Sequence, residues 1–123
     1  MSSKRILLIE DNKEDASFAK RTLEEKGYEV FEAFTGKDGI DMALSKNPDL
    51  ILLDLILPDM TGEEVCRQLK EDKRTRKIII IILSVKDEIE DIQELFRRGA
   101  NDYIIKPPVP EYLVNKVSLY IGC

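Results

Sequence analysis

The stretch Leu50-Ile-Leu-Leu-Asp54 is an unbroken apolar run that ends in a carboxylate. The same pattern occurs at Ile6-Leu-Leu-Ile-Glu-Asp11, and a longer apolar run, Ile78–Leu83, is followed by Ser84. Short unbroken apolar runs are typical of strands that are buried on both faces, as in parallel sheets. These stretches therefore predict the central strands of an α/β fold, with a polar residue directly after each strand.

Two further segments complete a predicted sheet of five strands. Tyr28–Phe34 mixes polar and apolar residues, which suits an edge strand, and Asp102–Ile105 is followed by Lys106-Pro-Pro. The stretches between and after the strands are amphipathic and predict five helices. Strands that alternate with helices imply a doubly wound, mostly parallel sheet with helices on both faces and right-handed crossovers. We expect one domain over residues 1–123.

Apolar residues at helical spacing define the inward face of each predicted helix. Thr61 begins the third helix with a capping-box pattern that Glu64 completes, and Asp87 is a candidate N-cap of the fourth. Gly27 and Gly99 stand where the first and fourth helices are expected to end. The predicted inward residues are Phe18, Ala19, Thr22 and Leu23; Ile40, Ala43 and Leu44; Val65 and Leu69; Ile89, Ile92, Leu95 and Phe96; and Tyr112, Leu113, Val117 and Tyr120.

Composition excludes several classes of function. The chain has 123 residues with 19 Lys+Arg and 24 Asp+Glu, a net charge of −5, and an acidic domain without a basic stripe is a poor candidate for nucleic-acid binding. Histidine is absent, which excludes Ser-His-Asp and Cys-His catalysis and the usual zinc sites. We expect neither a membrane span nor a signal peptide. Two cysteines form no disulfide framework, which suits the cytoplasm.

Polar side chains at the strand exits are expected to meet at one rim, because ligands of open α/β sheets bind outside the carboxyl ends of the strands. The first strand supplies Glu10 and Asp11, the third Asp54, the fourth Ser84 and the fifth Lys106. Two carboxylates roughly 4 Å apart repel by about 4 kcal/mol at an effective dielectric of about 20. Such a cluster either keeps a proton or binds a cation. Mg²⁺, or in its place Mn²⁺, suits these oxygen ligands.

A metal site beside a lysine and a hydroxyl is typical of phosphoryl transfer. The chain contains neither GxxxxGK[ST] nor GxGxxG, so nothing in it cradles the phosphates of a nucleotide. The expected reaction is attack by a carboxylate on an incoming phosphoryl group, which forms an aspartyl-phosphate. Because the chain has no histidine, the phosphodonor must come from outside these 123 residues.

The ordered set of motifs resembles the receiver domain of two-component response regulators over the whole chain. The resemblance rests on Ile6–Asp11, Leu53–Gly62, Leu83-Ser84 and Gly99–Pro107. It implies a flavodoxin-like fold with strand order 2-1-3-4-5. It also implies a histidine kinase or histidine phosphotransfer protein as donor, and a downstream protein or a fused output domain as target. A dimer that depends on phosphorylation is compatible with the same resemblance.

The resemblance assigns roles at the metal site. Asp54 would be the phosphoacceptor and would also contact the metal. Asp11 would bind Mg²⁺ directly, and Glu10 would act largely through water. The backbone carbonyl of Ile56 would complete the protein ligands.

The resemblance also assigns the parts of a switch. Ser84 would hydrogen-bond the phosphoryl oxygen and Lys106 would pair with it, with a cis bond before Pro107. Tyr103 would turn inward when Ser84 is drawn to the phosphoryl group. The output face would comprise the fourth helix, the fifth strand and the fifth helix, beginning near Arg97-Arg98 and Tyr103.

Three positions depart from the commonest pattern of the family. Glu10 replaces the more frequent Asp, Ser84 replaces Thr, and Val85 stands where Ala or Gly is usual. Val85 is expected to narrow access to the phosphoacceptor, and neither Ile56 nor Lys86 can orient an attacking water. We therefore expect a comparatively long-lived aspartyl-phosphate.

Two alternative hypotheses belong to other functional classes. A magnesium-dependent phosphatase that turns over free substrates would need a general acid beside its nucleophile, yet Asp54 is followed by Leu55-Ile56. A vestigial receiver would be an interaction module that works without phosphorylation, yet every residue type of the site is present. The favoured hypothesis is a protein that accepts a phosphoryl group on its own Asp54, supports its own dephosphorylation and is not a turnover enzyme.

Overall fold

The computed structural model describes residues 3–85 and 89–122, in which strands and helices alternate as the sequence predicts. The strands are β1 (Arg5–Ile9), β2 (Glu29–Ala33), β3 (Leu50–Leu53), β4 (Ile79–Ser84) and β5 (Asp102–Ile105). The helices are α1 (Lys13–Glu24), α2 (Gly36–Lys46), α3 (Gly62–Glu71), α4 (Ile89–Arg97) and α5 (Pro110–Ile121). Lys86 and the candidate N-cap Asp87 lie outside the described residues.

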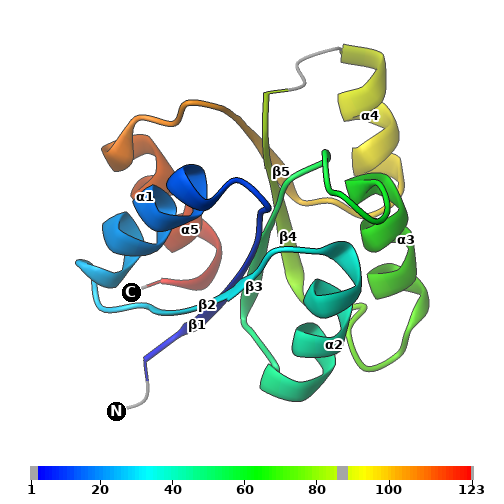
Figure 1. The fold of residues 1–123 in the computed structure, drawn as a ribbon, viewed down its shortest axis with the longest axis horizontal. Coiled ribbons are helices and arrows are strands. Elements are labelled where there is room, and N and C mark those ends of the chain that lie inside the picture. Colours follow the sequence, from blue (N-terminus) through cyan, green and yellow to red (C-terminus); the bar gives the residue numbers. More distant parts are fainter. Residues whose placement is uncertain (1–2, 86–88, 123) are drawn as a thin grey trace.

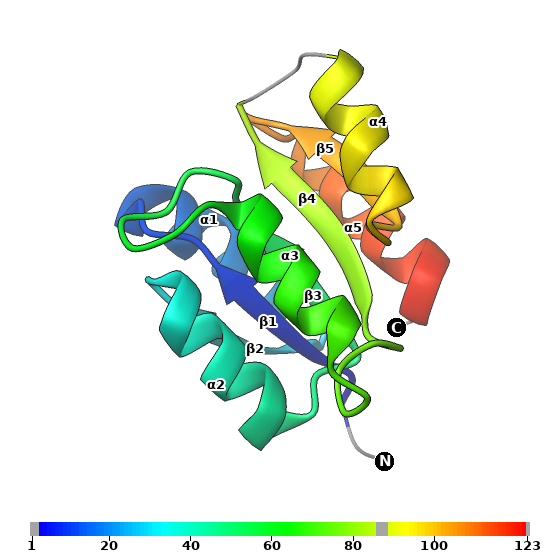
Figure 2. The same ribbon diagram turned by 90° about the vertical axis from the view of Figure 1, so that its right-hand side faces the viewer.

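All strands of the described chain run parallel in one sheet, in the order β2-β1-β3-β4-β5. This confirms the fold class and the strand order that the resemblance implies. Helices α1 and α5 cover one face of the sheet, and α2, α3 and α4 cover the other (Figure 1). Figure 2 shows the second layer in front of the sheet. Among the described residues, no helix combines the length and the apolar character needed to cross a bilayer.

The central strands are unbroken apolar runs because both of their faces are buried. In β1, Ile6 and Leu8 pack into the core beneath α1 and α5, whereas Leu7 and Ile9 pack into the core on the opposite side. The four residues of β3, Leu50–Leu53, divide between the two cores in the same alternating way and are all fully buried. Burial of each such side chain contributes about 1.5–3 kcal/mol, so the central strands stabilise both layers.

Where their side chains are described, the helices follow the predicted stripes with two exceptions at the edges; the side chain of Ile89 lies outside this described part. Leu95 and Leu113 are buried as expected, but Phe96 is 43% exposed and Tyr112 is 49% exposed. The prediction that Phe96 and Tyr112 face inward is therefore wrong. Helical spacing defines the centre of an apolar face, and a residue at the border of that face lies on either side of it according to how the helix packs.

The ends of α1 and α4 lie where the glycines predict them. The predicted capping box at the start of α3 is only half formed. Gly27 and Gly99 adopt positive φ angles of 94° and 109° after α1 and α4, a conformation that glycine reaches without steric cost. Thr61 caps α3 by accepting a hydrogen bond from the backbone N–H of Glu64 at 3.1 Å. The carboxylate of Glu64, however, accepts from the side chains of Arg67 and Gln68 instead of completing the capping box.

Candidate functional site

The register of the parallel sheet brings the ends of β1 and β3 together. Ile9 is paired with Leu53, so the loops after these strands begin side by side. The backbone N–H of Asp54 donates to the carbonyl oxygen of Ile9 at 3.0 Å. As a result, carboxylate oxygens of Glu10, Asp11 and Asp54 all lie within 4.8 Å of one another. Glu10 and Asp54 are buried, and Asp11 is exposed.

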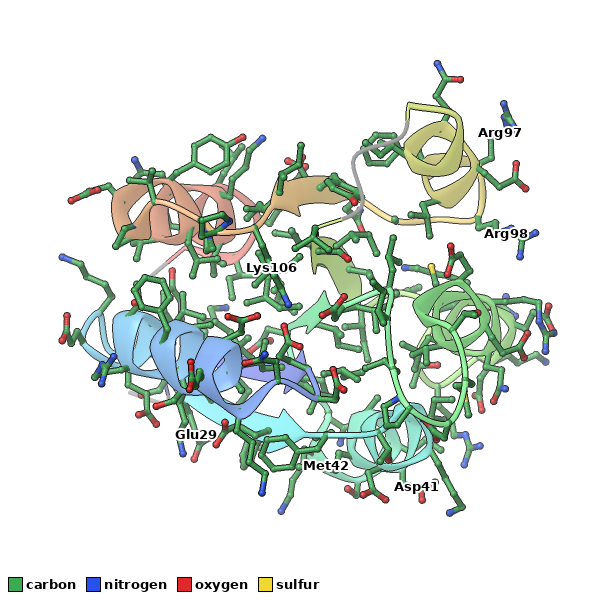
Figure 3. All side chains as sticks on the ribbon, turned by 45° about the horizontal axis from the view of Figure 1, so that its top comes forward. Glu29, Asp41, Met42, Arg97, Arg98 and Lys106 are labelled. Carbon is green, nitrogen blue, oxygen red and sulfur yellow. The ribbon has the colours of Figure 1, made fainter. Side chains whose placement is uncertain are left out.

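Lys106 enters this acidic cluster from the end of β5. Its backbone N–H donates to the carbonyl oxygen of Ser84 at 3.0 Å, and its side chain is 8% exposed. The ammonium lies 2.7 Å from Oδ2 of Asp54 and hydrogen-bonds Oε1 of Glu10. In Figure 3 its side chain points from the end of β5 toward the start of α1 and the loop after β1. The Lys106–Pro107 bond is cis, as the resemblance implies.

Both carboxylate oxygens of Asp54 have fixed partners. The hydroxyl of Ser84 donates to Oδ1 at 2.9 Å, and the backbone N–H of Ile56 donates to the same atom at 3.1 Å. Oδ2 accepts from Lys106. Ser84 is fully buried and Asp54 is 6% exposed, so these contacts are formed where the interactions of charges are strong. The site therefore holds one carboxylate in a defined orientation at the mouth of the sheet.

The cluster keeps Asp54 ionised. Burial alone would raise the pKa of Asp54, but hydrogen bonds from Lys106, from Glu10 and from the backbone of Ile56 outweigh it and lower the pKa. Glu10 is affected in the opposite direction, because burial and the proximity of Asp54 raise its pKa to about 7, against the opposing effect of Lys106. For Lys106, burial disfavours the charge, but the two carboxylates raise the pKa of its ammonium.

The donor set fits a hard divalent cation. Carboxylate oxygens are the ligands that Mg²⁺ prefers in proteins, and Mg²⁺ binds through one or two carboxylates while it keeps several waters. The three clustered acids are Glu10, Asp11 and Asp54, and one lysine offsets only part of their charge. Ile56 begins the loop after Asp54, where its backbone pairs with Thr61 in an isolated antiparallel bridge. Its role as a carbonyl ligand stays a prediction.

A further acid, Asp15, belongs to this cluster and is absent from the sequence-based set. Its Oδ2 lies 3.1 Å from the ammonium of Lys106. It stands in the first turn of α1, where Asn12 caps its backbone N–H at 2.9 Å. Asp15 does not directly follow a strand, so the pattern of polar strand exits does not include it. The signal that would have found Asp15 is an acid in the first helical turn after an acidic strand exit, since this turn faces the same rim.

The remaining residues singled out from the sequence lie around the rim or beside it. Val85 and Ile56 have exposed side chains, with 58% and 55% of their surface accessible. Tyr103, in β5, is half-buried and packs against the core on the α2, α3 and α4 side, with its hydroxyl oxygen buried. The structure thus places two apolar side chains beside the acidic cluster and an aromatic ring next to the layer that contains α4.

Arg97 and Arg98 lie at the end of α4, away from the acidic cluster. Each pairs with Glu94, at 2.5 Å and 3.2 Å respectively. Both side chains are exposed and project outward from the layer of α3 and α4 in Figure 3. These arginines therefore do not contribute to the cluster around Asp54.

Comparison with known proteins identifies a single family. The family model described as the response regulator receiver domain matches residues 6–118. The chain is 40% identical over 113 residues to the response regulator ArlR of Staphylococcus saprophyticus, covering 92% of this chain and 50% of ArlR. It is 34% identical over 118 residues to protein PilH of Pseudomonas aeruginosa, covering 96% of this chain and 98% of PilH. The chain thus spans about half the length of one relative and nearly all of the other.

A solved structure agrees with these matches. The phosphorylated cyanobacterial phytochrome response regulator RcpA superposes with a TM-score of 0.87 at 28% sequence identity. The superposition covers 98% of this chain and 96% of RcpA. The agreement in fold therefore extends over nearly the whole of both chains.

Proposed function

The chain belongs to the response regulator receiver domain family, and from this premise we propose that it accepts a phosphoryl group on Asp54 in a Mg²⁺-dependent reaction. Receiver domains are phosphoacceptors and not turnover enzymes. The single observation that carries the proposal is the environment of Asp54. This buried carboxylate has a lowered pKa, a serine hydroxyl on one oxygen and a lysine ammonium on the other.

Asp54 acts as the nucleophile. One of its carboxylate oxygens bonds to phosphorus while the bond between phosphorus and the donor nitrogen breaks, and the leaving imidazole takes up a proton. A carboxylate performs this step only while ionised, and its hydrogen bonds keep it so at neutral pH. Ser84 and Lys106 are already within hydrogen-bond distance of the oxygens, so little reorientation precedes the attack.

The charge of the phosphoryl group determines what the neighbouring residues do. Glu10, Asp11 and Asp54, with the backbone carbonyl of Ile56, would hold Mg²⁺, and a bound Mg²⁺ supplies positive charge toward the phosphoryl oxygens. Lys106 supplies a second positive charge on the other side. Without these cations, the dianionic group would stand against the clustered carboxylates.

Phosphorylation gives Ser84 and Lys106 a new partner, and this provides the energy for a switch. Moving a two-state equilibrium from 1:99 to 99:1 requires about 5.5 kcal/mol, and charge-assisted hydrogen bonds contribute about 1.5–3 kcal/mol each. We propose that Ser84 moves toward the phosphoryl group and that Tyr103 follows it inward. The change would then reach α4, β5 and α5, which form the output face.

The partners follow from the chemistry of the donor. Membership of the receiver-domain family supports a histidine kinase or histidine phosphotransfer protein as the donor, since the chain has no histidine of its own. The target of the receiver is a downstream protein or a fused output domain, and the output face allows a dimer that forms on phosphorylation.

Cys66 is buried as a free thiol, in keeping with a reducing cytoplasm.

The proposed function is tested with a small phosphodonor. Incubation with radiolabelled acetyl phosphate and Mg²⁺ is expected to label the wild-type chain once, and neither Asp54→Asn nor EDTA-treated wild type is expected to take up label. Asp41→Asn, in an exposed acid on α2, is the matched control and keeps full labelling. A wild-type chain that stays unlabelled would overturn the proposal and favour an interaction module that works without phosphorylation.

A further inference from the structure

The loop between β3 and α3 begins at Asp54 and is closed tightly at its base. The backbone N–H of Gly62 donates to the carbonyl oxygen of Leu55 at 2.9 Å, and Ile56 pairs with Thr61. A Cβ on Gly62 would stand 2.4 Å from the backbone oxygen of Asp54, so the loop closes this closely only with glycine. Residues 57–60 therefore form a short tip that projects from a fixed base.

Asp59 attaches this tip to a different element, helix α2. Its Oδ1 accepts from the backbone N–H of Gly36 at 2.7 Å, and its Oδ2 accepts from the backbone N–H of Lys37 at 2.9 Å. These N–H groups belong to the first turn of α2, where backbone donors lack partners within the helix. The hydrogen bonds from Lys37 and Gly36 lower the pKa of Asp59, so it carries its charge at the positive end of the helix dipole.

A close apolar contact lies beside the two hydrogen bonds. Met60, at the tip of the loop, packs so near to Gly36 that a Cβ there would stand 2.5 Å from Cγ of Met60. Met60 is half-buried against the core beneath α2 and α3. The loop tip is thus fixed to α2 by the two hydrogen bonds of Asp59 and by the packing of Met60. The described contacts of these two residues with α2 do not involve the side chain of Asp54.

We propose that Asp59 is a positioning residue of the metal site, which holds the β3–α3 loop against α2 so that the backbone of Ile56 keeps its place beside the carboxylates. This inference rests on the proposed function, because it takes Ile56 as a metal ligand through its carbonyl. Ile56 is only three positions from Asp59, and its backbone is already tied to Asp54 and to Thr61. Release of the tip from α2 would loosen the pairing of Ile56 with Thr61, which spans the tip. The carbonyl of Ile56 would then be held less firmly, and metal binding would weaken.

Thr35 supplies a matched control, because its hydroxyl caps the same helix through Asp38 and not through a residue of the loop. Its hydroxyl accepts from the backbone N–H of Asp38 at 3.1 Å. Both Thr35→Ala and Asp59→Ala remove acceptors from the first turn of α2 and are expected to lower its stability. Only Asp59→Ala releases the loop. If Asp59 acted only as a helix cap, the two variants would bind metal equally well. A positioning role predicts weaker metal binding in Asp59→Ala alone.

The test is a titration of the metal-free proteins with Mn²⁺. Electron paramagnetic resonance of the free ion gives the dissociation constant. Asp59→Ala is expected to raise the dissociation constant about ten-fold, which is the usual scale for residues that support metal ligands. Thr35→Ala is expected to leave it unchanged, and Asp59→Asn, which keeps one acceptor oxygen, is expected to lie between wild type and Asp59→Ala. Urea unfolding of each variant establishes that it is folded at the titration temperature.

A second measurement separates positioning from chemistry. With acetyl phosphate as donor, Asp59→Ala is expected to be phosphorylated slowly at low Mg²⁺ and at the wild-type rate when Mg²⁺ is saturating. An unchanged dissociation constant in Asp59→Ala, or an equal rise in Thr35→Ala, overturns the positioning role and leaves the proposed function intact. A wild-type protein that binds no Mn²⁺ overturns both.

Discussion

Lys106 is the residue on which the unphosphorylated site depends most. One buried ammonium faces Glu10, Asp54 and Asp15, so removing it leaves like charges in contact with no counterion. Breaking a buried ion pair by deleting one partner costs about 3–5 kcal/mol.

Lys106→Met is expected to lower the free energy of unfolding by about 3 kcal/mol in the absence of divalent ions, because two buried carboxylates lose their cation. The double variant Asp54→Asn/Lys106→Met is expected to recover part of that loss, since one of the repelling charges is gone. Urea denaturation in EDTA measures both. A double variant no more stable than Lys106→Met would contradict the charge argument.

We expect a comparatively long-lived aspartyl-phosphate on Asp54, because the two exposed side chains at the rim are apolar. Ile56 and Val85 offer no group that orients a water. Ile56→Asn, which adds an amide, and Val85→Ala, which opens the approach to Asp54, are both expected to speed the loss of phosphate several-fold. Loss of radiolabel from the purified phosphoprotein gives the rate, with Leu119→Ala, at an exposed position in α5, as control. If neither variant loses label faster than wild type, the long lifetime has another origin.

At the scale of the elements, β5 and α5 are joined by a polar network beneath the output face. Oδ2 of Asp102 accepts from Lys116 at 2.8 Å and from the hydroxyl of Tyr120 at 2.9 Å. Burial would raise the pKa of Asp102, but these hydrogen bonds and that of the Tyr103 N–H hold it below its usual value. The network fixes the start of β5 to the last turns of α5.

Lys116→Met is expected to cost about 1 kcal/mol of unfolding free energy at pH 7. The folded pKa of Asp102 lies below its unfolded value, so its contribution is full above about pH 4 and is lost as the pH falls through the folded pKa. The difference in the free energy of unfolding between Lys116→Met and wild type should therefore shrink toward pH 3. Urea unfolding across this range measures it. Lys37→Met removes an exposed pair with Asp41 and should show a negligible difference at every pH.

The strands and helices could be predicted from the sequence more completely than the contacts between them. The unbroken apolar runs identified the central strands β1, β3 and β4, because a strand buried on both faces has no polar position to interrupt it. Residues that directly follow strands were expected at one rim, since parallel strands end on the same side. The order of the strands came from the family resemblance, because apolar patterning alone does not specify which strands are neighbours.

Asp15 and Asp59 show what the sequence does not reveal. Each looks like an ordinary acid in a helix first turn or in a loop, and each has a partner far along the chain, Lys106 and the start of α2. Such contacts depend on how loops and helices pack over the sheet. The inward faces of Phe96 and Tyr112 were mispredicted for the same reason, since their exposure depends on the rotation of α4 and α5.

At the scale of the molecule, the site around Asp54 adjoins the proposed output face through the paired strands β4 and β5. Ser84 ends β4, and Tyr103 lies in the neighbouring β5, where Ser84 is paired with Ile105. A displacement of Ser84 toward a phosphoryl group is therefore expected to reach β5 before it reaches β2, at the opposite edge of the sheet.

Addition of beryllofluoride and Mg²⁺ is expected to shift backbone amide resonances around Asp54 and across α4, β5 and α5. The amides of β2 and of the C-terminal half of α2 should change little, because those segments lie on the far side of the sheet. Two-dimensional ¹⁵N spectra measure this, with Asp54→Asn as the control that should not respond. Shifts confined to the α1 and α2 edge would contradict the assignment of the output face.

The contact between Lys106 and Glu10 joins residues 96 positions apart, from the last strand and the first. During translation the acids of β1 and β3 leave the ribosome long before this lysine does. A nascent chain therefore carries an incomplete acceptor until β5 has emerged and paired with β4. We therefore expect the ability to accept a phosphoryl group only in polypeptides whose sheet has been completed.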